Sequence, residues 1–228
     1  MNPVPVTESA WTSNPFEAQY LKLYDITPPP VPDAPLSLNG AAYQIGSEVA
    51  FEWSAADDPE GGLSGFRVQL GSAAGQADLL DTIVTDASVS LGGLPFGSVI
   101  FARVSQINQA GIEGDFSDSS IGVVLLDPSA DSDGDGQSNA AEQLAQTDPL
   151  DASSRLHVMS IRLVDGDVSL SISSIAGVGY QLQTSNSLED GSWIDLGETV
   201  VATDLVTELT HPAGQEASRR FYRIRVVP

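Results

Sequence analysis

The chain has 228 residues, a formal net charge of -22, 41% hydrophobic residues and no cysteine. This acidity disfavours nucleic acid and anionic membranes as partners, so we expect neither. The absence of cysteine excludes disulfides, thiol catalysis and thiolate metal sites. No apolar run approaches the roughly 18 residues of a membrane span. We therefore expect a folded chain with no membrane span.

The amino-terminal segment, residues 1–27, is predicted to be an extended arm or the tail of a preceding domain. Within it, "AQYLKLYD" (18–25) has the alternation of a strand. The first residues lack the basic region and apolar core of a signal peptide. We expect either that a signal peptide was removed or that this sequence is a fragment of a longer chain. The prolines of "DITPPPVPDAP" (25–35) then predict a stiff spacer.

Strand patterns dominate the remainder, as short β-branched or alternating runs separated by turn residues. They predict an all-β fold with two β-sandwiches. A calcium-binding loop with one short helix, "NAAEQLAQ" (139–146), joins them. The expected domains are a first sandwich at 28–127, a linker at 128–155 and a smaller sandwich at 156–228.

The first sandwich resembles a fibronectin type III domain. Trp53 matches the buried tryptophan of the second strand. The segment "LPFGSVIFARVSQINQAG" (94–111) matches a characteristic run of the family, with Leu94, Gly97, Arg103, Val104, Asn108 and Gly111 in place. The resemblance covers about 90 residues, and with it we expect both β-sandwiches to be immunoglobulin- or fibronectin III-like. Ile100 stands where the family has its corner tyrosine, which indicates a divergent member.

The acidic stretch "DSDGDGQSNAAE" (131–142) has the spacing of a calcium loop. Aspartates at positions 1, 3 and 5, glycine at 6 and glutamate at 12 wrap six to eight oxygens around one ion. We predict side-chain ligands from the aspartates and Glu142, a backbone carbonyl from Gln137 and a water-mediated contact from Asn139. The predicted carboxylate ligands are Asp131, Asp133, Asp135 and Glu142.

The charge balance of this loop favours a bound cation. Two carboxylates ~5 Å apart repel by roughly 3 kcal/mol at an effective dielectric near 20. No lysine or arginine lies between Arg103 and Arg155 to offset this repulsion. The alternative is a solvated Asp/Gly linker in which Glu142 merely caps the helix, paired with Asn139.

The loop lacks the partner of a regulatory EF-hand pair, because Pro128 stands where an entering helix would be needed. Together with "QTDPLDASS" (146–154), it resembles a single thrombospondin type 3-like repeat of bacterial proteins. In such repeats the ion staples a linker. The resemblance implies Asp148 and Asp151 as further ligands of the same or a second calcium ion.

The carboxy-terminal region, 156–228, is predicted to contain five or six strands, with a hairpin that turns at Asp165-Gly166. It resembles a small β module at the ends of secreted bacterial proteins. Because the last strand ends the chain, we expect an open sheet edge. The expected core residues are Tyr180, Leu188, Trp193, Leu196, Phe221 and Tyr222.

Catalytic patterns are missing from the sequence. His157 and His211 are isolated, the acidic stretch "ADDPEGG" (56–62) lacks the calcium-loop spacing, and there is no phosphate-binding loop. The chain is therefore predicted not to be an enzyme.

These observations predict a non-catalytic, calcium-stabilised structural or adhesive module of a secreted or cell-surface bacterial protein, in which the ion fixes the angle between the sandwiches. One alternative is an extracellular filament subunit that joins other copies of itself by strand addition through residues 1–24. Another is an accessory region of a secreted polysaccharide-degrading enzyme, which binds surface glycans through Trp11 and Trp193.

Overall fold

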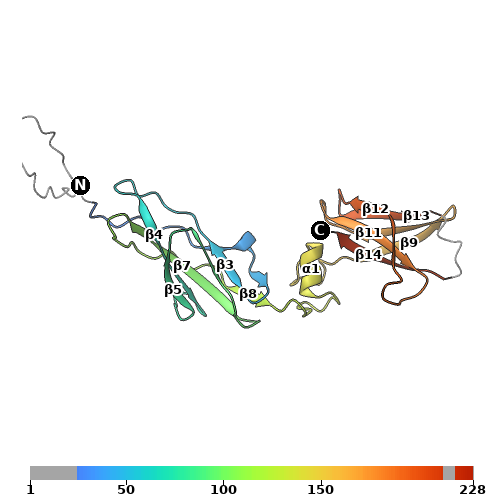
Figure 1. Cartoon of the computed structure of the whole chain (residues 1–228), viewed down its shortest axis with the longest axis horizontal. Helices are drawn as coiled ribbons and strands as arrows, with labels where there is room; N and C mark the ends of the chain where they lie inside the picture. The colour runs from blue at the N-terminus through green and yellow to red at the C-terminus, as the bar shows by residue number, and fades with distance from the viewer. Residues whose placement is uncertain (1–24, 213–218, 228) are drawn as a thin grey trace, which may run out of the picture. The chain divides into compact units, whose positions relative to one another are not determined.

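The computed structural model describes residues 25–212 and 219–227 (Figure 1). The chain divides into two compact units, Met1–Leu125 and Leu126–Pro228. Each consists of strands, with a single α-helix among the described residues, so the predicted all-β fold class is confirmed. None of the helical segments in these ranges is long and apolar enough to cross a membrane.

The first unit is a sandwich of two sheets with the orders β1-β3-β6 and β2-β8-β7-β4-β5. Two facing β-sheets are the architecture expected for a fibronectin III-like fold. A 3-10 turn, η1 (Leu38–Gly40), follows the first strand. The strands are β1 (Leu36–Ser37), β2 (Tyr43–Ile45), β3 (Val49–Glu52), β4 (Leu63–Gly71), β5 (Leu80–Val84), β6 (Ser88–Leu91), β7 (Val99–Asn108) and β8 (Val123–Leu126).

The first core lies between these sheets. Trp53 packs edge-on against Phe66, with 5.5 Å between the ring centroids. Ile100 is 1% exposed and belongs to the same cluster. An aliphatic side chain therefore replaces the expected tyrosine by packing in the core, which stabilises the fold by burial instead of by a hydroxyl hydrogen bond.

The second unit begins with the acidic loop and helix α1 (Asn139–Ala145), followed by two three-stranded sheets with the orders β13-β10-β9 and β12-β11-β14. The predicted hairpin turn is confirmed: Asp165 and Gly166 have φ of 51° and 98° between β9 and β10. The strands are β9 (Val158–Val164), β10 (Asp167–Ser173), β11 (Gly179–Ser185), β12 (Ile194–Val201), β13 (Val206–His211) and β14 (Phe221–Val227).

The second core is built around Tyr180, which is 1% exposed and whose hydroxyl accepts a hydrogen bond from the Ile175 amide at 3.0 Å. Leu196 and Tyr222 pack against this core as expected. The expectation for Leu188 is wrong, because it lies in a surface loop and is 69% exposed.

Phe221 and Trp193 also differ from the expected pattern. Each is only partly buried, and neither packs in the second core cluster. Their rings instead meet cationic side chains, with the Arg219 guanidinium 5.4 Å from the Phe221 centroid and the Arg223 guanidinium 4.4 Å from that of Trp193. A cation over an aromatic face stabilises such a half-exposed ring.

Because the two cores are separate clusters, a cavity in one should leave the other unit intact. We expect Leu170→Ala to destabilise the second unit by about 2–5 kcal/mol, and Leu70→Ala to destabilise the first by a similar amount. Differential scanning calorimetry should show one shifted transition per variant. A common transition that both variants shift equally would contradict this.

Candidate metal centre

Three aspartates converge in the loop 131–142. One carboxylate oxygen each from Asp131, Asp133 and Asp135 lie within 4.8 Å of one another. These are the first three predicted ligands, at positions 1, 3 and 5, and the backbone of the loop brings them together. A cluster of this size matches the space that calcium requires, with oxygens 2.3–2.6 Å from the ion.

The loop backbone wraps around the first aspartate. The amides of Gly134 and Gly136 donate to the two carboxylate oxygens of Asp131, at 2.8 and 2.9 Å. Both glycines have positive φ, 80° and 96°, a conformation that side-chain-bearing residues rarely adopt. The spacing of glycine in the motif therefore allows the chain to fold back with its carboxylates turned inward.

Helix α1 places Glu142 in its first turn. Ser138 is the cap, because its hydroxyl accepts from the Ala141 amide at 3.3 Å. The backbone amide of Asn139 donates to the Ala130 carbonyl at 2.8 Å. The alternative in which Glu142 pairs with Asn139 as a cap therefore finds no support in this geometry, and the glutamate is left for another role.

Glu142 is completely buried beside the aspartates. Its Oε1 accepts from the Thr147 hydroxyl at 3.4 Å, whereas Oε2 has no hydrogen-bond partner in the described ranges. Burial, followed by the charges of Asp133 and Asp135, raises the pKa of Glu142 to about 7. Asp133 Oδ2 is likewise buried without a partner among the described residues. Two buried carboxylate oxygens in this loop therefore have no hydrogen-bond donor among the described residues, an arrangement that a bound cation would stabilise.

Protein cations do not fill that role in the described structure. Arg155 is the nearest arginine that follows the loop in sequence, and its Nη1 donates to the backbone carbonyl of Asp135 at 3.4 Å. The negative charge of the carboxylates therefore remains uncompensated by this side chain.

Gln137 and Asn139 connect the loop to its surroundings. The side-chain Nδ2 of Asn139 donates to the Asp127 carbonyl at 2.7 Å, and its Oδ1 accepts from the Ser132 backbone amide at 3.3 Å. The Gln137 side chain donates to the Leu156 carbonyl at 3.3 Å. Their predicted roles, a water-mediated contact and a backbone-carbonyl ligand, stay predictions.

The structure does not bring Asp148 and Asp151 into the cluster. Both are exposed, and their carboxylates accept hydrogen bonds within their own turns. Asp148 Oδ1 accepts from the Leu150 amide, and Asp151 Oδ1 accepts from the amide and hydroxyl of Ser153, at 3.0, 3.0 and 2.7 Å. Hydrogen bonds from Ser153 lower the pKa of Asp151. Their role as further calcium ligands stays a prediction.

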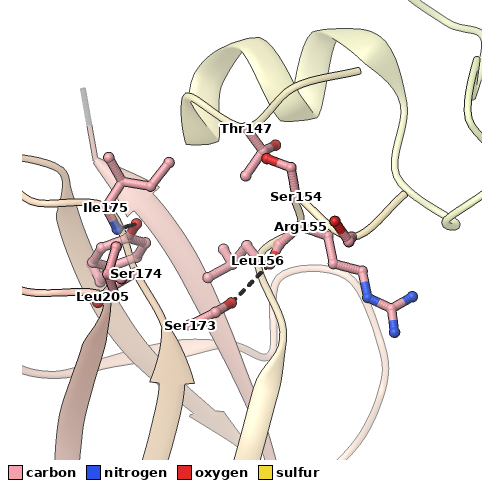
Figure 2. A pocket seen from close by; sticks show the side chains of 10 residues that line it. Thr147, Ser154, Arg155, Leu156, Ser173, Ser174, Ile175 and Leu205 are labelled. Atoms are coloured by element: carbon pink, nitrogen blue, oxygen red, sulfur yellow. Dashed lines mark hydrogen bonds between the residues drawn. The ribbon is translucent and has the colours of Figure 1, made fainter. Parts of the chain in front are cut away.

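The segment after the helix lines a cavity of about 240 Å³ with the end of the second sandwich (Figure 2). In Figure 2, Thr147 and Ser154 face Ile175 and Leu205 across it. The Ser173 hydroxyl donates to the Arg155 carbonyl at 2.8 Å, which ties this segment to β10. The acidic loop and the sandwich are thus linked within one unit.

Sequence reasoning missed two residues of this site. Thr147 is the only described hydrogen-bond donor to the Glu142 carboxylate, and Ser138 caps the helix that carries it. Serine immediately before a helix is a recognisable cap signal. No local pattern marks Thr147, because its contact depends on the left-handed turn at Gln146 that ends the helix.

The remaining candidate residues have structural contacts. The Arg223 guanidinium covers one face of Trp193, and Trp11 lies outside the described residues. His211 contacts the Tyr222 hydroxyl at 3.0 Å through Nδ1, and burial together with Arg220 lowers its pKa. His157 Nδ1 lies 3.1 Å from the Ser173 hydroxyl.

No protein-family model matches the chain, and no curated protein matches it. Among solved structures, titin module A71 from human cardiac muscle is 17% identical, covers 42% of this chain and 91% of its own, and has a TM-score of 0.34. The FN1–FN3 domains of chicken CNTN1 are 15% identical, with 87% and 60% coverage and a TM-score of 0.43. A Fn3-like protein from Clostridium thermocellum is 19% identical, with 46% and 98% coverage and a TM-score of 0.31.

Replacing Glu142 should have opposite effects with and without calcium. In chelator we expect Glu142→Gln to leave the second unit as stable as the parent or more stable, because a buried charge is removed. In calcium we expect the same variant to unfold at a lower temperature than the parent, because a ligand is lost. Thermal unfolding under both conditions checks this, with the exposed Glu198→Gln as the matched control. Equal shifts under both conditions would contradict a ligand role.

Proposed function

We propose that residues 131–142 bind one calcium ion and that this ion stabilises a non-catalytic structural module. The observation that carries the proposal is the buried Glu142 carboxylate, which has an unpartnered oxygen and lies beside three aspartates. Folding such a site without a cation requires burial of a charge without compensation or protonation of the glutamate. A divalent ion removes this cost.

The donor set favours calcium over other ions. The side-chain donors are carboxylate oxygens, the chain has no cysteine, and neither histidine belongs to the cluster. Soft or borderline metals prefer sulfur and imidazole ligands. Magnesium demands near-ideal octahedral geometry at shorter distances, whereas calcium accepts six to eight oxygens in a flexible loop. The resemblance of residues 131–142 and 146–154 to a thrombospondin type 3-like repeat supports the same ion.

The contacts of the loop explain how the ion would act on the second unit. Asn139 holds the loop to the carbonyl of Asp127, and Gln137 and Arg155 join it to the chain that leads into β9. An ion that orders the loop therefore orders both flanking segments. Its binding free energy is added to the free energy of unfolding of this unit.

A structural or adhesive role outside the cell follows as part of the proposal. Extracellular calcium modules bind with Kd values of about 10⁻⁴–10⁻³ M, so a lone site in one loop is useful where calcium is abundant. The fibronectin III-like first unit is consistent with a spacing or adhesive role. That the ion also sets the angle between the sandwiches stays a prediction.

Calcium should raise the unfolding temperature of the parent chain. At a free ion concentration 100 times Kd the gain is about 2.7 kcal/mol, which for a unit of this size corresponds to a shift on the order of 10 °C. Isothermal titration calorimetry should give one ion per chain. Asp133→Asn should abolish both signals, whereas Asp190→Asn, at an exposed position of the same unit, should preserve them.

The decisive negative result would be a parent chain with no binding heat and no thermal shift at 10 mM calcium. A binding heat and thermal shift that persist in Asp133→Asn would show that the ion binds outside this loop. A second binding event lost only in Asp148→Asn or Asp151→Asn would assign those residues to a second ion.

A further inference from the structure

Strand β9 is an edge strand with unusually apolar side chains. It pairs with β10 on one side and has no second partner within the described ranges. Edge strands invite pairing with another chain, and proteins usually protect them with lysine, proline or inward charges. β9 has no lysine or proline. Its side chains Val158, Met159, Ile161, Leu163 and Val164 are 49%, 53%, 59%, 61% and 52% exposed.

Part of this apolar surface belongs to the core side of the sheet. Ile161 and Leu163 lie opposite Leu170 and Val168, which are 2% and 9% exposed. Residues opposite one another in a ladder share a face. The core side of the sheet thus continues onto β9, where the second sheet of the sandwich leaves it uncovered.

The free backbone groups follow from the hairpin. Val164 and Asp167 flank the two-residue turn and form its closing hydrogen-bonded pair. Since hydrogen-bonded and non-hydrogen-bonded pairs alternate, the amide and carbonyl of Leu163 and Ile161 point away from β10. The register shifts opposite Met159, so the regular, unpaired edge extends from Ser160 to Val164.

Charge is distributed unequally along this edge. The chain enters β9 past Arg155, and it leaves through Asp165. In an antiparallel approach of two β9 strands, Arg155 of each copy lies toward Asp165 of the other. A parallel approach would bring like charges together. The edge is therefore complementary to itself in one orientation.

We propose that β9 pairs antiparallel with β9 of a second copy of the chain, about a two-fold axis at Ile161. In this register Ile161 lies opposite its own symmetry mate, and Arg162 lies opposite Ser160. The neighbouring register would place Arg162 opposite Arg162 in a close pair, and like charges directly opposite are destabilising. The two three-stranded sheets become one six-stranded sheet.

Such a contact closes on itself. An isologous two-fold interface uses the same strand on both copies and stops at a dimer, whereas a strand donated by residues 18–24 of a neighbour would be heterologous and would build a filament. Pairing of β9 with β9 therefore predicts a dimer, whereas pairing of β9 with the amino-terminal segment of another copy predicts a filament. The inference does not depend on calcium, because none of the proposed ion ligands lies in β9.

Single cysteines test the register, because the chain has none of its own. In the proposed dimer the two copies of Ile161→Cys face each other with Cα atoms about 5.5 Å apart, within disulfide range. Leu163→Cys lies opposite Met159 and is too far from its own mate. Ile83→Cys, on the 65% exposed edge position of β5, is the matched control in the first unit.

Under mild oxidation of the full chain, we expect Ile161→Cys to form a disulfide-linked dimer at least about tenfold faster than either control. Sedimentation of the cysteine-free chain should show a monomer–dimer equilibrium. Ile161→Lys should shift it to monomer, and Ile83→Lys should leave it unchanged. Repeating both measurements in chelator and with Asp133→Asn separates this interface from the calcium site.

Three results would overturn the proposal. One is a parent chain that stays monomeric with no enhanced cross-linking at position 161. Another is equal cross-linking of all three cysteine variants, which indicates random collision. The third is association that Leu21→Asp and Leu23→Asp abolish while Ile161→Lys does not, which would assign self-association to the amino-terminal segment.

Discussion

Glu142 places a carboxylate in a fully buried position beside three aspartates, so the second unit folds against the cost of a buried charge unless a cation compensates it or the glutamate is protonated. The helix that carries Glu142 is only seven residues long and has a polar cap, so it contributes little stability of its own. Burial raises the cost of the charge, and the aspartates add repulsion. In the proposed calcium site, the same groups that oppose folding without a cation are the ligands of the ion.

This electrostatic constraint extends beyond the loop through hydrogen bonds. Asn139 and Gln137 use their side-chain amides to connect the two ends of the loop to the flanking chain, at Asp127 and Leu156. These contacts connect the loop to the segments on either side of it. The exposed edge of β9 has a different origin, because each sheet of the second sandwich has only three strands. The proposed ion binding depends on the buried carboxylates of the loop. The proposed edge pairing depends on the unpaired backbone groups and exposed apolar side chains of β9.

Local chemistry made much of the chain predictable. The alternation of strands, the Asp165-Gly166 turn and the convergence of the three loop aspartates each depend on residues close together in sequence. Glycine at Gly136 permits the fold-back, and the 1-3-5 spacing then turns the carboxylates inward. The core expectations for Leu188 and Trp193 failed for the opposite reason. Leu188 is apolar, but no distant segment within the described residues covers its loop. Trp193 is only partly covered, with the Arg223 guanidinium over its ring in place of core side chains.

The sequence by itself determined the all-β class, the fibronectin III-like pattern of the first unit, and the identity and order of the carboxylates in the acidic loop. Only the tertiary structure decided that Glu142 is sealed from water with an unpartnered oxygen, that Thr147 reaches it, and that Ile161 and Leu163 are uncovered. The physical reason is that turn geometry and ligand spacing arise from neighbouring residues. Burial depends on which remote parts of the chain pack over a given atom, and that information is spread over the whole fold.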